Sequence, residues 1–429
     1  MANRVLSRGG AHDGGARGDT RHQHVHRKRL VWLLGPAFVA AIAYVDPGNV
    51  AANLSAGAEY GYLLVWVLIA ANLTAMIVQY LSAKLGLVTG ESLPSILGAR
   101  LRKPARRAFW LQAELVAAAT DLAEVVGGAV ALYILFDIPL VWGGMIIGAV
   151  SMLLLATADR AGQRWFEALV TVLLVIITIG FTAGLLISDL DPAGMAQGMI
   201  PRFEDTRSLM LAAAILGATV MPHAIYLHSD LIRDRFGTGI PERTVARLLK
   251  ASRWDVFLSL ILAGGVNLAM LLLAAAALPG VEGTETIEGA HAAITGAMGP
   301  FIGVLFGIGL LASGLASTSV GSYAGASIMK GLLHMQIPLL WRRLTTLIPA
   351  LVILALGIDP TFALVVSQVL LSIGIPAALI PLVIYTGRRS IMGRFANPLP
   401  LQAAAWVTTA LIVALNAVLI VLVCLGYDV

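Results

Sequence analysis

Two short segments combine side chains that could bind a cation with a proline that interrupts a helix. The first is the Asp-Pro-Gly-Asn sequence at 46–49, and the second is the Met-Pro-His sequence at 221–223. Both lie inside long apolar runs. Proline removes a backbone donor and clashes with the preceding turn, so each helix must bend or unwind there. Unwound backbone at membrane depth is tolerated only where it is buried in protein or lines a cavity, which predicts a binding site at the breaks.

Oxygen ligands are concentrated at the first break. A carboxylate such as Asp46 is expensive inside a membrane and usually marks an ion pathway. Asn49 follows three residues later and can present a second oxygen to the same point. Unwinding would also free upstream carbonyls, including that of Ala43. The alternatives are an Asp46 that is protonated or paired, and an Asn49 that bonds a neighbouring helix.

The second break adds a sulfur ligand. Met221 stands next to Pro222, and small residues precede it, which suits close approach of a ligand and a freed Ala218 carbonyl. A thioether beside oxygen ligands favours Mn²⁺, Fe²⁺ and later transition metals over Mg²⁺ or Ca²⁺. The alternative is a Met that only fills space in an apolar helix.

Three amides lie in other apolar runs. Gln368, near the start of span ten, is either an extra oxygen ligand or a hydrogen-bonding partner between helices. Asn72 in span two and Asn267 in span seven are expected to form hydrogen bonds between helices.

Five titratable residues could move protons. His223 and His228 lie five apart on one span and are expected either to carry protons or to bond neighbouring groups. Glu114, Asp121 and Glu124 recur at spacings of seven and three, which places them on one helical face. They form either a proton conduit or ion pairs with arginines of the inner half.

The elements that must position these residues are membrane helices. The chain is 58% hydrophobic and 12% charged, with a mean hydropathy of +0.86, whereas soluble domains carry about 25% charged residues. An all-α polytopic membrane protein follows, with eleven predicted spans at 33–58, 62–83, 109–135, 139–157, 165–188, 208–229, 255–278, 300–329, 344–357, 361–385 and 401–426.

The basic residues set the orientation. If the N-terminus is cytoplasmic, 27 of the 29 Lys and Arg residues fall on the cytoplasmic side, all except Arg202 and Arg207. This asymmetry predicts a cytoplasmic N-terminus and a C-terminus outside. It also explains the pI near 9.5 without a nucleic-acid partner.

Residues 1–30 are polar and basic, and we expect a disordered cytoplasmic tail. The alternating histidines of this tail, His22, His24 and His26, could bind metal weakly, but a solvated tail is favoured. The single cysteine, Cys424, excludes an internal disulfide.

The two breaks suggest an internal repeat. Spans one to five (31–190) and six to ten (207–386) would form an inverted pair whose first helices are both broken, with span eleven (398–427) as an appendage. The alternative is eleven helices with two unrelated proline kinks.

The chain resembles the natural-resistance-associated macrophage protein (Nramp) family and, within it, the bacterial manganese transporters. The resemblance covers about residues 32–425, through GPAFVAAIAYVDPGN, NLTAMIVQYLSAKLG, TDLAEVVGGA, LGATVMPHAIYLHS, RWDVFLSL and DPTFALVVSQVLLS. It implies a leucine-transporter-like fold and proton-coupled import of divalent metals. The implied metal ligands are Asp46, Asn49, Met221, the Ala43 and Ala218 carbonyls and, in some conformations, Gln368. The implied proton-linked positions are Asp46, Asp121, Glu124 and His223, and Arg342 and Arg343 match basic residues at the inner end of span nine.

We therefore expect a proton-coupled importer of Mn²⁺ and Fe²⁺, and also of Cd²⁺ and Co²⁺, working by alternating access in a bacterial cell membrane. We expect no enzyme activity, no cofactor, no soluble partner and a monomer. The alternative is a Na⁺-coupled amino-acid or amine symporter of the same architecture, against which Asp46 argues. An intramembrane enzyme and a channel are further alternatives, although no H-E-x-x-H or G-x-S-x-G motif is present.

Overall fold

The computed structural model describes residues 35–161, 163–284, 286–335 and 338–425. Within these ranges the regular structure is helical and no strand occurs. The α-helices and short 3-10 helices (η) are α2 (Pro36–Ile42), η3 (Ala43–Val45), α3 (Pro47–Tyr60), α4 (Val65–Thr89), α5 (Leu93–Arg100), α6 (Lys103–Phe136), α7 (Leu140–Ala161), α8 (Gln163–Thr182), η4 (Gly184–Ile187), α9 (Pro192–Gly198), α10 (Thr206–Thr219), α11 (Pro222–Phe236), α12 (Glu242–Ala277), α13 (Ile287–Met298), α14 (Pro300–Leu333), α15 (Leu339–Ala355), α16 (Pro360–Gly387), α17 (Arg389–Met392), η5 (Gly393–Phe395) and α18 (Leu399–Cys424). The predicted tail, with its three histidines, lies outside the described residues.

Each predicted span coincides with one helix or with a broken pair. Among the described residues, eight helical segments are long and apolar enough to cross a membrane, and Pro36–Val45 and Leu140–Ala156 are shorter apolar helices. Two predicted spans are shorter than the helices that contain them. α6 begins at Lys103 rather than at 109, and α12 begins at Glu242 rather than at 255. Hydropathy detects only the apolar part of a helix, whereas these helices continue through basic residues that suit a membrane interface.

The helix of the first span is broken at Asp46, as predicted. α2 ends at Ile42, η3 follows, and Asp46 is extended (φ −72°, ψ 168°) before α3 begins at Pro47. Proline is tolerated at this first helical position because its missing N–H would have no helical partner there. Asp46 caps α3 by accepting a hydrogen bond from the Asn49 backbone N–H. The break therefore places Asp46 and Asn49 together at the start of α3.

The second break has the same construction. α10 ends at Thr219, Met221 is extended (φ −69°, ψ 124°), and α11 begins at Pro222. The last carbonyls of α10 have no partner within that helix. Carbonyls at such a helix end are suited to a cation.

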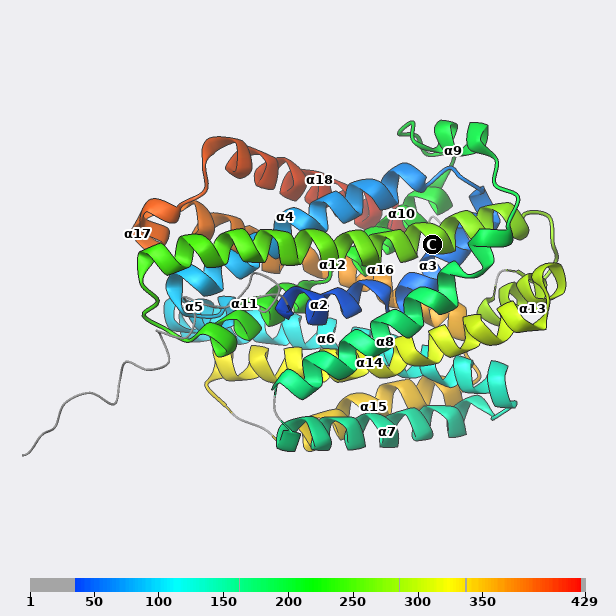
Figure 1. Ribbon diagram of the computed structural model, residues 1–429, viewed down its shortest axis with the longest axis horizontal. Helices are drawn as coiled ribbons and strands as arrows, with labels where there is room; N and C mark the ends of the chain where they lie inside the picture. The colour runs from blue at the N-terminus through cyan, green and yellow to red at the C-terminus, as the bar shows by residue number, and fades with distance from the viewer. Residues whose placement is uncertain (1–34, 162, 285, 336–337, 426–429) are drawn as a thin grey trace, which may run out of the picture.

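The broken helices lie inside the bundle. α3, α10 and α16 contact one another, and α12 contacts α2, η3 and α3. In Figure 1, α7 and α15 lie along one edge of the bundle, while α18 lies along the opposite edge beside α4. A large apolar cluster, which includes Val45, Val50 and Met221, surrounds both breaks. The breaks open the first helix of each predicted half, as an inverted repeat requires, but the boundaries 31–190, 207–386 and 398–427 stay predictions.

Candidate functional site

The carboxylate of Asp46 is buried and only half satisfied. Its Oδ1 accepts hydrogen bonds from the backbone N–H of Asn49 at 2.8 Å and from Asn49 Nδ2 at 2.7 Å. Its Oδ2 has no hydrogen-bond partner among the described atoms. A buried oxygen of a carboxylate is costly without a partner, so Oδ2 is available to a cation.

Asn49 joins the two breaks. Its Nδ2 also donates to the Ala218 carbonyl oxygen at 3.0 Å, which ties the first turn of α3 to the last turn of α10. Asp46, Asn49, Ala218 and Met221 are all buried. Residues 169 positions apart in sequence thus share one place, as the ligand prediction requires. Ala43 is the first residue of η3, directly before the break.

Gln368 approaches the first break from α16. A Cβ atom added to Gly48 would overlap the Gln368 side chain, so the two residues are in contact. Its Nε2 donates to the Ser367 hydroxyl at 3.0 Å, whereas its Oε1 has no partner among the described atoms. The Gln368 atom closest to this Cβ position is Nε2, so Gln368 contacts the break, and its role as a metal ligand stays a prediction.

Asn267 belongs to the same group, although sequence reasoning assigned it only to helix packing. Its Nδ2 donates to the Tyr44 carbonyl at 2.6 Å and to Asn49 Oδ1 at 3.3 Å. It does connect helices, as expected, but the helix it connects to is the broken one. In the sequence, Asn267 is distinguished only as a polar residue deep within a predicted span. Asn72 has the same property, so the sequence does not separate a residue of the site from one that only connects helices.

Two of the three acids on α6 form ion pairs. Glu114 pairs with Arg342 at 2.8 Å. Asp121 pairs with Arg343, which also donates to the Ser151 hydroxyl at 2.9 Å. Glu114 and Asp121 therefore form the ion pairs with arginines that were the alternative to a proton conduit. Their partners, Arg342 and Arg343, are the basic residues that the family resemblance matched at the inner end of span nine.

Glu124 differs from the other two acids. It is buried, its Oε2 has no partner among the described atoms, and no ion pair to it is found there. Gly321 of α14 lies against it, since an added Cβ would be 3.0 Å from both carboxylate oxygens. Three residues further along α6, Gly127 packs on Pro47 beside Asp46. Glu124 is thus the acid of α6 that lies near the break at Asp46.

The histidines of α11 contact different partners. His223 Nδ1 lies 3.4 Å from the Thr120 hydroxyl, next to Asp121 in sequence. His228 Nδ1 lies 2.8 Å from Gln79 Oε1, and Gln79 in turn donates to the Tyr44 hydroxyl at 2.5 Å. His223 therefore faces the acidic face of α6, whereas His228 bonds a neighbouring helix, which was the alternative for it.

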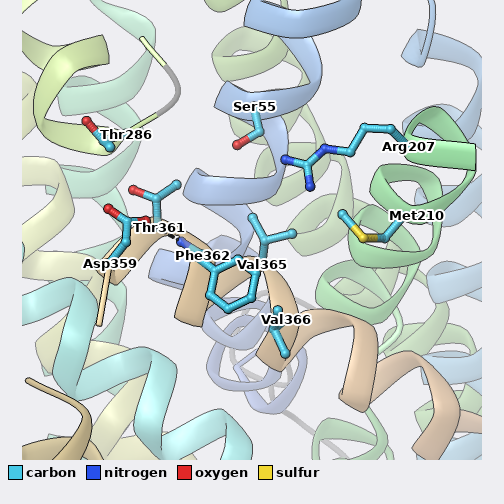
Figure 2. Close-up of a pocket in the computed structure, with 9 residues that line it drawn as sticks. All are labelled: Ser55, Arg207, Met210, Thr286, Asp359, Thr361, Phe362, Val365 and Val366. Atoms are coloured by element: carbon cyan, nitrogen blue, oxygen red, sulfur yellow. Dashed lines mark hydrogen bonds between the residues drawn. The ribbon is translucent and has the colours of Figure 1, made fainter. Parts of the chain in front are cut away.

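A cavity of about 240 Å³ lies between the same three helices that form the site. Figure 2 shows its lining, which includes Ser55 of α3, Met210 of α10 and Val366 of α16. Ser55 is six residues beyond Asn49, or roughly 9 Å along the helix. Arg207 at its rim is held by Glu59, with bonds of 3.1 and 3.0 Å. The cavity is suited to be a vestibule on the side where α3 ends and α10 begins.

A buried set of candidate ligands between two broken helices of a polytopic bundle is typical of a secondary membrane transporter. The sequence pattern of the family described as "Natural resistance-associated macrophage protein-like" matches residues 37–422. The chain belongs to this Nramp family, and it is a multi-pass membrane protein.

Known proteins support this assignment. The chain is 58% identical over 395 residues to the "Divalent metal cation transporter MntH" of Mycobacterium tuberculosis strain CDC 1551, which covers 92% of each chain. A crystal structure of the manganese transporter of Eremococcus coleocola, in a variant form, matches with a TM-score of 0.82 at 29% identity, over 94% of this chain and 88% of that one. A nucleobase-cation-symport-1 family transporter is similar in fold alone, with a TM-score of 0.53 at 16% identity over 91% of each chain. The predicted fold class and family are confirmed.

Proposed function

We propose that this protein imports divalent transition metals, Mn²⁺ and Fe²⁺ above all, and Cd²⁺ and Co²⁺, by alternating access coupled to protons. The observation that carries the proposal is the contact between the two breaks. It gathers a half-satisfied carboxylate, an amide and a helix-end carbonyl in one buried place, and Met221 is buried three residues beyond that carbonyl. The names of the relatives above support metal as the substrate.

In this proposal the metal is bound by Asp46, Asn49, Met221, the carbonyls of Ala43 and Ala218, and at some stage Gln368. The described residues contain no group of three or more His, Cys, Asp or Glu side chains placed to hold a metal ion. A site with a single carboxylate suits a cargo, because transport requires binding that is weak enough for release. The Met221 sulfur would favour Mn²⁺ over Ca²⁺ and Mg²⁺.

Protons would travel along α6. Glu124 has a free carboxylate oxygen and lies nearest to Asp46, and His223 lies against the same helix. The Asp121–Arg343 pair would continue the route inward, and the Glu114–Arg342 pair would follow it toward the cytoplasmic side. His228 bonds Gln79 and would act on this route only indirectly. Burial of these groups favours transfer among side chains rather than to bulk water.

We further propose a bacterial cell membrane location, with the N-terminus in the cytoplasm and the C-terminus outside. The vestibule between α3, α10 and α16 would then face outward. We propose that the protein works as a monomer without a cofactor, an enzyme activity or a soluble partner.

Uptake into proteoliposomes tests the function. We expect saturable uptake of Mn²⁺ and Cd²⁺, little uptake of Ca²⁺ or Mg²⁺, and a higher rate with an inward proton gradient. Asp46→Ala should abolish uptake, whereas Asp189→Ala, which removes an exposed loop carboxylate, should leave it unchanged. Absence of divalent metal uptake by folded, inserted protein would overturn the proposal. Amino-acid-dependent Na⁺ uptake would instead support the symporter, which the relatives do not favour.

A further inference from the structure

A second cavity lies away from the metal site, on the surface formed by α4, α10 and α18. It is a groove of about 540 Å³. Its lining is almost entirely apolar and includes Val67 and Ala70 of α4, Ala212 of α10, and Leu411 and Leu415 of α18. Ala212 is buried at its floor, whereas Leu411 is 65% exposed at its rim.

The groove is apolar along most of its length, and the hydroxyl groups of its lining residues are those of Thr74 and Thr408. Thr408 donates its hydroxyl to the Ala404 and Ala405 carbonyls of its own helix, so this hydroxyl is already hydrogen-bonded. An apolar occupant is therefore suited to this part of the groove.

The length of the groove matches one leaflet of a bilayer. The lining residues extend from Trp66 to Thr74 along α4 and from Thr408 to Val418 along α18. At 1.5 Å per residue these segments are about 12 and 15 Å long. The hydrocarbon region of a bilayer is about 30 Å thick, so one leaflet occupies about 15 Å.

One end of the groove carries the features of a membrane interface. Trp66 and Phe203 pack there with ring centroids 5.4 Å apart, and Trp66 Nε1 donates to the Arg202 carbonyl at 3.3 Å. Tryptophan and other aromatic rings concentrate at the level of lipid headgroups. The groove thus ends at Arg202, where a headgroup would lie.

The Arg202 side chain is free to bind an anion at this end. Arg202 and Arg207 are the two basic residues outside the predicted cytoplasmic segments. Arg207 is paired with Glu59, whereas Arg202 is exposed and has no side-chain hydrogen bond or ion pair among the described residues. A guanidinium matches the geometry of a phosphate oxygen pair.

We propose that this groove binds one phospholipid, with an acyl chain lying between α4 and α18 against α10 and the phosphate at Arg202. A narrow apolar channel with one charge at its interfacial end fits that chemistry. The lipid would support α10, whose other end carries the Ala218 carbonyl of the metal site.

Native mass spectrometry of the purified full chain, released from nanodiscs containing phosphatidylglycerol, tests this proposal. We expect one retained phospholipid per protein. Ala70→Trp and Ala414→Trp fill the groove from exposed alanines, and both should lower retention roughly tenfold. Two variants on different helices guard against loss of folding in one of them. Leu73→Trp, which changes an exposed neighbour outside the groove lining, should retain the lipid.

The headgroup contact is tested separately. Arg202→Gln should reduce retention of phosphatidylglycerol roughly tenfold and leave retention of uncharged diacylglycerol unchanged, whereas Arg389→Gln at another exposed site should change neither. Equal retention in all variants, or a second protein copy in place of the lipid, would overturn the proposal. The experiment measures lipid retention and not metal uptake. Failure of the lipid proposal is therefore distinguishable from failure of the proposed transport function.

Discussion

The two carboxylate oxygens of Asp46 have different surroundings, and this difference bears on binding. Oδ1 is held by Asn49 through two hydrogen bonds, which fixes the direction of the carboxylate. Oδ2 remains unpartnered within the described structure. Asn49 is held in turn by Asn267 and by the Ala218 carbonyl. The residues proposed to bind metal are thus oriented before it arrives, which lowers the cost of binding.

The sulfur of Met221 can be tested by its removal. Met221→Ala should preserve part of the Mn²⁺ or Cd²⁺ uptake but admit more Ca²⁺ and Mg²⁺, because only oxygen ligands remain. We expect the preference for Mn²⁺ over Ca²⁺ to fall roughly tenfold, or about 1.4 kcal/mol. Competition uptake in proteoliposomes measures this ratio. Met210→Ala, which changes a methionine of the vestibule lining, is the matched control. Unchanged selectivity in Met221→Ala would contradict the role given to sulfur.

The ion pair between Asp121 and Arg343 gives a second prediction at this scale. Arg343→Gln leaves a buried carboxylate without its cation, which costs about 3–5 kcal/mol. The melting temperature in detergent should therefore fall clearly. Combining the change with Asp121→Asn should recover much of the loss, because no unpaired charge is left. A double variant as unstable as the single one would argue against direct pairing.

At the scale of elements, the site depends on how closely α3, α10 and α16 approach one another. A Cβ added at Gly217 of α10 would overlap the Gln368 carbonyl of α16 and lie 2.8 Å from the Ser372 nitrogen. These are backbone atoms, so neither can rotate away. The residue at 217 therefore has to be glycine for Gln368 and the end of α10 to meet.

We expect Gly217→Ala to push α10 and α16 apart at a cost of about 1–3 kcal/mol. Metal affinity should fall, because the Ala218 carbonyl and Gln368 move away from Asp46. Gly265→Ala on α12 is the control, since a Cβ there meets nothing within 4 Å. Thermal unfolding and Cd²⁺ binding by calorimetry report the two effects. If both variants behave like the parent chain, close packing of these helices is not what assembles the site.

At the scale of the whole molecule, alternating access requires the vestibule to respond to metal. The described structure has a cavity on one side of the site, between the helices that provide the ligands. Metal bound at Asp46 and Met221 would draw the start of α3 toward the break between α10 and α11, because the two ligands come from separate elements.

This response predicts a change in accessibility. In a Cys424→Ser background, which removes the single exposed cysteine, Val366→Cys places a thiol in the vestibule lining. We expect saturating Mn²⁺ to slow its labelling by a membrane-impermeant reagent several-fold. Adding Asp46→Ala should remove the effect of Mn²⁺. A labelling rate that is the same with and without Mn²⁺ in the background without Asp46→Ala would show that the vestibule does not close.

The amino-acid sequence alone determined the membrane class, the places where two helices break, and the types of ligand gathered there. Long apolar runs must be helical in a membrane because the backbone has no other hydrogen-bond partners. Proline beside polar residues at 46–49 and beside Met221 predicted the two breaks, whereas Pro349, Pro376 and Pro381 lie inside continuous helices. Only the tertiary structure decided which groups meet. Asn267, Gln368 and Ala218 lie far from Asp46 in sequence, and both Glu114 and Asp121 have arginine partners while Glu124 has none among the described residues. Such pairings depend on the relative rotation and depth of packed helices, which hydropathy and spacing do not specify.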